Sequence, residues 1–311
     1  MLRCFSFNKG ALNSFQEPGP LLLLAACILA SLMILVPSLA IFAQKKEQRG
    51  SHPVMTPENL SSEDREIVEQ AIGVVCSERQ LDPLGSVPID DMQRRPSLSL
   101  RTPEVISGAE RAQRLLPSAK ALAIATLRKL SHSYQVDRSS NHNQRMSRAI
   151  ARIQAVVRVK PDIDARDNAS VYLKNPRMIT FGTIFLAGLP SDEGLISVLA
   201  HELTHIGDGN SATLQPLFHA VGERASQLTG LRVREQRAEE LTCDLVGALS
   251  VQSFILNSPN YDPRSRRLAR AVEHNCVDED DSDEEHLSPR STLRAVLSLD
   301  RALRHELIYK Q

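Results

Sequence analysis

The chain has 311 residues, of which 42% are hydrophobic, and its 37 basic and 37 acidic residues give a formal net charge of zero. This length and hydrophobic content exclude a wholly disordered chain and predict one domain of catalytic size with appendages. The balanced charge gives no general electrostatic reason to expect a nucleic-acid partner. Aromatic residues make up only 4% and tryptophan is absent, which disfavours surfaces that stack sugars or single-stranded bases.

Residues 1–43 are predicted to be a signal peptide or an N-terminal membrane anchor. The segment 21–43 reads `LLLLAACILASLMILVPSLAIFA`, an apolar run that is long for a signal peptide and just long enough to span a bilayer. Small residues near its end suit a signal peptidase, so cleaved and uncleaved forms both stay open. The basic residues that flank the run are nearly balanced and do not settle the orientation of an anchor, and we favour export of the rest of the chain.

The next part of the chain, residues 44–108, is rich in proline, serine and charged residues. Its composition predicts a linker, interrupted by one short amphipathic segment at 63–75 that we interpret as a transient or docking helix. The folded domain is predicted to cover 109–311. Only three cysteines follow residue 43: Cys76, Cys243 and Cys276. A disulfide between Cys76 and Cys276 with Cys243 as a buried free thiol, or three unpaired thiols, both fit an exported protein.

The domain begins with helical periodicity and then changes character. Apolar residues recur at helical spacing in 109–131 and again from 143 to about 156. The segments `AVVRVK`, `SVYLK` and `RMITFGTIFLAG` follow, and their β-rich composition predicts a small antiparallel sheet ahead of the next helix. The expected fold class is therefore α+β and mainly helical.

The stretch `LISVLAHELTHIGDGN`, residues 195–210, places two histidines four residues apart in an otherwise mostly apolar run. Pro190 and Ser191 followed by two acidic residues predict the start of a helix. On that helix His201 and His205 share one face, where both imidazoles could bind one ion, while Glu202 is rotated about 100° away. The alternative is a core helix that carries polar side chains by chance.

We favour a metal site over a chance core helix, because buried polar groups are costly unless something satisfies them, and a metal ion bound to them does so. A carboxylate beside a metal could take a proton from water and return it to a leaving amine while zinc polarises the carbonyl. The metzincin pattern is excluded, because Asp208 and Ser211 replace its glycine and third histidine.

A carboxylate from a second helix could complete the site. The candidates are Glu223, Glu235, Glu239 and Glu240. The helical register places Glu240 and Asp244 together at the edge of a buried stripe, and Gly247 would allow close approach to another helix. We interpret Glu240 as the third ligand and Asp244 as an acceptor that holds a ligand histidine. Glu235, Arg237 and Glu239 look like ordinary solvated positions.

Over about residues 145–300 the sequence resembles the HtpX and CAAX-prenyl-protease type of zinc metallopeptidases, a gluzincin family with exported, BepA-like members. The resemblance rests on `DNASVYLKNPRMITFGTIFLAGLPSDEGLISVLAHELTH` and on `EELTCDLVGA`. It implies a zincin-type domain with one zinc ion per chain. It also implies the ligands His201, His205 and Glu240, the base Glu202 and the supporting Asp244.

The same resemblance assigns further substrate contacts. Arg294 would contact the transition state or the substrate. Ile179, Thr180, Phe181 and Gly182 would form an edge strand on which an extended peptide lies. Where the family has a histidine before a C-terminal proline, this chain has Ser288, and the nearby His286 is out of register.

The resemblance therefore implies a zinc endopeptidase of cell-envelope protein quality control that acts on protein or peptide substrates. It would be periplasmic, or tethered to the inner membrane by an uncleaved N-terminal segment and facing the periplasm. The alternative is an exported zinc-containing chaperone-like or scaffolding module with little or no peptidase activity. In that case a covering segment such as 44–110, or a fourth protein ligand such as His219, would silence the site.

Overall fold

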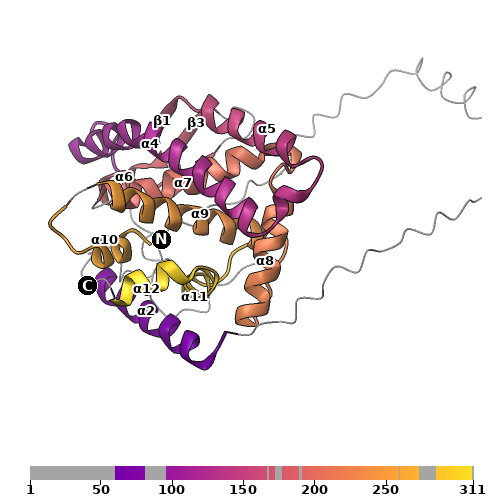
Figure 1. The fold of residues 1–311 in the computed structure, drawn as a ribbon. Coiled ribbons are helices and arrows are strands. Elements are labelled where there is room, and N and C mark those ends of the chain that lie inside the picture. Colours follow the sequence, from indigo (N-terminus) through magenta and orange to yellow (C-terminus); the bar gives the residue numbers. More distant parts are fainter. Residues whose placement is uncertain are drawn as a thin grey trace, which may run out of the picture. The chain divides into compact units, whose positions relative to one another are not determined.

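The helix that carries the histidine motif, α7 (Asp192–Asp208), lies in the middle of the fold (Figure 1). The computed structural model describes residues 60–80, 96–166, 168–171, 177–188, 191–258, 260–272 and 285–309. These residues belong to one compact unit. The predicted signal peptide or anchor and Cys276 lie outside them. Among the described helices, none is both long and apolar enough to cross a bilayer.

The described part of the chain is mainly helical, as the periodicity predicted. Helices surround α7 on several sides, and its partners in the core include α4, α5, α9 and α10. Their bounds are α2 (Ser62–Gln80), α4 (Pro103–Ser133), α5 (His142–Ala155), α6 (Thr183–Gly188), α8 (Gln215–Thr229), α9 (Gln236–Asn257), α10 (Arg264–Ala271), α11 (Pro289–Leu299) and α12 (Arg301–Tyr309).

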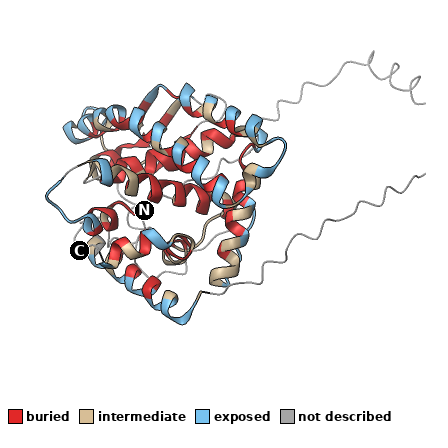
Figure 2. Cartoon of the chain, in the orientation of Figure 1, coloured by how far each residue is buried: buried red, intermediate tan, exposed pale blue. Residues whose placement is uncertain are grey.

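Helix α7 is buried along nearly its whole length. Of its 17 residues 14 are buried, and buried residues concentrate along α7 and α9 (Figure 2). Ser191 caps the helix by accepting a hydrogen bond from the backbone N–H of Gly194 at 3.1 Å. Because its apolar residues face neighbours on all sides, α7 is held by tertiary packing rather than by one amphipathic face.

The sheet has three strands, β1 (Arg158–Asp162), β2 (Ala169–Val171) and β3 (Met178–Gly182), in the order β1-β3-β2. Strand β3 pairs in parallel with β1 and antiparallel with β2. The predicted antiparallel sheet is thus a mixed sheet. Alternating side chains show which face of a strand is buried, but they do not encode the direction of its neighbour.

The position of β3 overturns the prediction of a substrate-binding edge strand at 179–182. Because β3 is central, its backbone groups are committed to strands on both sides. Ile179 and Phe181 are fully buried. The apolar run after β3 also does not continue as a strand, because Thr183–Gly188 forms α6. Short apolar runs do not distinguish a buried strand from a buried helix.

The segment predicted to be a transient helix in a linker is part of the core. Helix α2 spans 19 residues and packs against α10, α11 and α12. Its buried side chains include Val68, Ile72 and Val75. The linker prediction for 44–108 is therefore wrong for α2, and for the start of α4 at Pro103. The surrounding proline and charge hid an amphipathic helix whose partners come from the far end of the chain.

The two described cysteines differ in state, as the first of the two predictions proposed. Cys76 on α2 is disulfide-bonded, and Cys243 on α9 is a buried free thiol. The prediction for Cys243 is confirmed, whereas the proposed partner of Cys76 lies outside the described residues.

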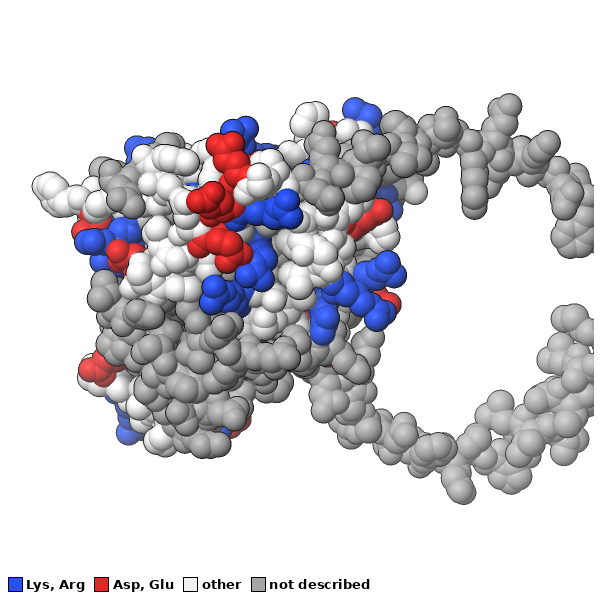
Figure 3. All heavy atoms as spheres, turned by 90° about the horizontal axis from the view of Figure 1, so that it is seen from below, with Lys and Arg blue, Asp and Glu red and all other residues white. Residues whose placement is uncertain are grey.

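On the face drawn in Figure 3, basic and acidic side chains lie next to one another.

Candidate metal centre

The two motif histidines of α7 direct their Nε2 atoms at each other. Residues four apart on a helix lie one above the other, and here the Nε2 atoms of His201 and His205 are 3.1 Å apart. Both side chains are close to fully buried, with exposed fractions of 11% and 12%. Two imidazoles in this position present a pair of lone pairs to one point in space.

Helix α9 brings a carboxylate to the same point. The Oε2 atom of Glu240, on this helix, lies 3.4 Å from Nε2 of His201 and 3.5 Å from Nε2 of His205. The close approach of the helices depends on Gly247, where a Cβ atom would lie 2.9 Å from the carbonyl oxygen of Ser197 on α7. A larger residue there would force α9, and Glu240 with it, away from α7.

The separations of these three atoms fit a single metal ion. Ligands at about 2.0–2.1 Å from a tetrahedral zinc ion are roughly 3.3 Å apart. The observed separations of 3.1, 3.4 and 3.5 Å bracket that value. Two imidazole nitrogens and a carboxylate oxygen are also a donor set that zinc accepts.

Each histidine is oriented by a carboxylate on its other ring nitrogen. Nδ1 of His201 is 2.9 Å from Oδ1 of Asp244, and Nδ1 of His205 is 2.9 Å from Oε1 of Glu239. Such partners hold the imidazole in the tautomer whose Nε2 is free to bind a metal. Asp244 therefore contacts a motif histidine, and its role as the support of a metal ligand stays a prediction. The reading of Glu239 as an ordinary solvated residue is wrong.

The electrostatics of Glu240 favour its ionised form. Burial alone would raise the pKa of this carboxyl group, but the charges and hydrogen bonds of His205 and His201 outweigh burial and lower it. A buried carboxylate is expensive unless cationic or hydrogen-bonding groups surround it. Glu240 therefore stands ready as an anionic ligand.

A fourth candidate ligand, Cys243, was missed by sequence reasoning. The ligand atoms of His201, His205 and Cys243 all lie within 4.8 Å of one another, so that this cluster could hold a metal ion. Burial raises the pKa of the Cys243 thiol to about 12, against an opposing influence of both histidines. A signal existed, because residues three apart share a helix face and Cys243 follows Glu240 by three.

Glu202, the predicted base, lies within α7 next to His201. The residue is only 1% exposed. Its place in the helix rotates it by about 100° from the adjacent ligand, beside the metal position rather than on it.

The other predicted contacts are distributed differently. His286, set aside as out of register, has its Nε2 atom 3.9 Å from Oε2 of Glu240, so the segment ahead of α11 does bring a histidine to the site. Arg294 on α11 instead donates to Glu69 of α2 at 2.8 Å. His219 on α8 is exposed beside Glu223. The structure therefore brings neither Arg294 nor His219 into the cluster.

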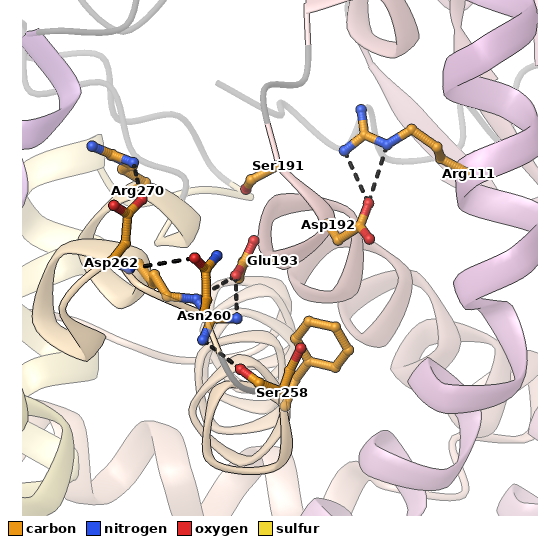
Figure 4. A pocket seen from close by; sticks show the side chains of 10 residues that line it. Arg111, Ser191, Asp192, Glu193, Ser258, Asn260, Asp262 and Arg270 are labelled. Atoms are coloured by element: carbon orange, nitrogen blue, oxygen red, sulfur yellow. Dashed lines mark hydrogen bonds and ion pairs between the residues drawn. The ribbon is translucent and has the colours of Figure 1, made fainter.

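A polar cavity of about 380 Å³ lies at the N-terminal end of α7 (Figure 4). His201 follows Asp192, the first residue of α7, by nine residues, or about 13.5 Å along the axis, so the cavity is separate from the candidate metal centre. The charged side chains that line it form ion pairs, namely Arg111 with Asp192, Arg267 with Glu193 and Arg270 with Asp262. The charges that line the cavity are therefore paired within the protein.

Comparison with known proteins adds no relative, because no family model, curated protein or solved structure matches the chain.

Proposed function

We propose that the protein is a zinc-dependent endopeptidase that binds one zinc ion per chain and uses Glu202 as a general base. The observation that carries the proposal is the convergence of three ligand atoms, from His201, His205 and Glu240, at the separations that one tetrahedral ion requires. The motif around these residues, and its resemblance to gluzincin peptidases, support the same chemistry.

The residues have separate roles in the proposed reaction. Zinc bound by His201, His205 and Glu240 would supply Lewis acidity that polarises the scissile carbonyl and activates water. Glu202 takes a proton from the attacking water and returns it to the leaving amine. Asp244 supports this work indirectly by fixing the imidazole of His201.

The substrate class and the location rest on the resemblance alone. We propose protein or peptide substrates in the cell envelope, and a periplasmic domain that is either released or held at the inner membrane by its N-terminal segment. An extended peptide would pair with β1 or β2, because β3 has a strand on each side. Pairing of a peptide with a sheet edge is a common recognition mode.

A zinc-containing scaffolding or chaperone-like module is the second candidate function. The observation that favours it is the sulfur of Cys243 near the two histidines. Four protein ligands characterise structural zinc sites, whereas catalytic sites keep one position for water. The two candidates differ in whether Glu202 matters, since only a peptidase needs a base.

The test combines metal analysis with peptide cleavage. Purified full-length protein should hold about one zinc ion per chain, and His201→Ala or His205→Ala should abolish binding. Glu202→Gln should retain zinc and fold but lose nearly all cleavage of a casein-type substrate, because an amide does not accept the proton. Glu223→Gln, an exposed position on α8, is the matched control and should behave as wild type.

Two outcomes would contradict the proposal. Full zinc occupancy in both histidine variants would refute the proposed metal centre. Cleavage by Glu202→Gln at the rate of the Glu223→Gln control would remove the proposed base, and with it the endopeptidase mechanism.

A further inference from the structure

The thiol of Cys243 occupies a position that calls for an explanation. A buried free cysteine is ordinarily a small hydrophobic residue packed among apolar side chains. Cys243 is fully buried on α9, but its sulfur lies within 4.8 Å of a ring nitrogen of His201 and of a ring nitrogen of His205. It therefore faces a cluster of polar side chains rather than apolar ones alone.

The helical register explains how three functional residues reach this cluster from α9. Cys243 and Asp244 follow Glu240 by three and four residues, and residues at these spacings share a helix face with it. Glu240 presents its carboxylate to both Nε2 atoms, and Asp244 binds Nδ1 of His201. Cys243 lies between two residues that already serve the site.

The chemistry of sulfur suits the same ion. A thiolate binds zinc at about 2.3 Å, so in a tetrahedral site its sulfur would lie roughly 3.5 Å from a histidine nitrogen. The 4.8 Å that bounds the present separations is closed by a small adjustment of a side chain with one rotatable bond. A set of two histidines, one glutamate and one cysteine would fill all four tetrahedral positions.

We propose that Cys243 is a fourth protein ligand of the ion held by His201, His205 and Glu240, and that its sulfur keeps the peptidase largely latent, with a low basal activity from the molecules in which water has replaced the sulfur. The inference rests on the proposed function. While the sulfur is bound, water has no coordination position at the metal. Activity requires water to replace the sulfur, so Cys243 regulates the site without acting on substrate.

The experiment uses full-length protein loaded with cobalt(II) in place of zinc, together with the zinc form. Wild-type protein should show the near-ultraviolet charge-transfer absorption of a thiolate bound to cobalt, and Cys243→Ala should lose that band while still binding about one metal ion. Removal of one ligand should weaken metal affinity by about tenfold or more. The zinc form of Cys243→Ala should cleave a casein-type substrate about tenfold faster or more, because a coordination position opens.

Ser250→Ala is the matched control. Ser250 is also fully buried on α9, lies two turns beyond Cys243, and loses one heavy atom when changed to alanine. It should keep the cobalt band and the wild-type activity, which separates loss of the sulfur ligand from loss of packing.

The outcomes distinguish the inference from the function on which it rests. Cobalt binding without the band in wild-type protein would overturn ligation by Cys243, while the Glu202→Gln comparison still judges the peptidase. A band in wild-type protein with no gain in cleavage by Cys243→Ala would overturn latency. Failure of both proteins to bind metal would instead refute the metal centre itself.

Discussion

The first turn of α7 contains two adjacent acidic residues whose replacement should have very different effects. Glu193 forms an ion pair with Arg267 of α10, with Nε of the arginine 2.6 Å from Oε1, and these side chains are only 10% and 5% exposed. Asp192 pairs with Arg111 of α4 at 3.0 Å, but there the exposed fractions are 37% and 27%.

The burial of each ion pair determines how much stability its loss should cost. Glu193→Ala would leave the buried guanidinium of Arg267 without its carboxylate partner, while its hydrogen bond to the carbonyl oxygen of Ser258, at 2.7 Å, would stay. Breaking a buried pair on one side costs about 3–5 kcal/mol, whereas an exposed pair contributes about 0–1 kcal/mol. Both substitutions also remove a negative charge from the helix N-terminus, about 0.3–1 kcal/mol in each case, so that this effect largely cancels in the comparison.

Thermal and denaturant unfolding of the two variants would measure the difference. We expect Glu193→Ala to lower Tm by roughly 10 °C, at about 2–4 °C per kcal/mol for a domain of this size, and Asp192→Ala to lower it by a few degrees at most. Adding Arg267→Met to Glu193→Ala should recover part of the loss, because the unpaired charge is removed. Equal destabilisation by both single variants, or no recovery in the double variant, would refute the argument from burial.

Two further predictions concern carboxylates near the candidate metal centre. Glu239→Gln and Asp244→Asn should each lower zinc affinity or activity by about 10–100-fold, with folding retained, because each residue orients one ligand imidazole through Nδ1. Burial raises the pKa of Asp208 to about 6, against an opposing hydrogen bond from the backbone N–H of Leu214. A raised pKa in the folded state stabilises the protein below about pH 4, and this contribution is lost as pH rises through about 6. Asp208→Asn should therefore gain stability relative to wild type over that window, by about 3 kcal/mol at most.

Each of these has a clear contrary result. Zinc titrations could show that Glu239→Gln binds zinc as tightly as wild type while Asp244→Asn binds it more weakly. That result would restore the view of Glu239 as a surface residue. For Asp208, unfolding free energies measured from pH 4 to pH 7 should diverge between wild type and variant. Parallel curves would show that the buried carboxyl does not titrate in this range.

The local sequence pattern was sufficient to predict the helices whose apolar residues recur at the helical period. Helix α7, with its cap at Ser191 and His201 and His205 on one face, follows from apolar spacing and capping chemistry that act within a few residues. The same period placed Glu240 and Asp244 together on α9. Burial of Cys243 also followed from its place within an apolar helix.

Tertiary structure alone decided which elements meet. The central position of β3 and the packing of α2 against α10–α12 depend on contacts between distant segments. The same is true of the arrival of Cys243, Glu239 and His286 at the candidate metal centre. Helix and strand periods specify which face of an element is apolar, but not the partner that covers it. The physical reason is that such pairings are selected by the free energy of burying whole faces together, which depends on the shape of both partners and is not encoded in either segment alone.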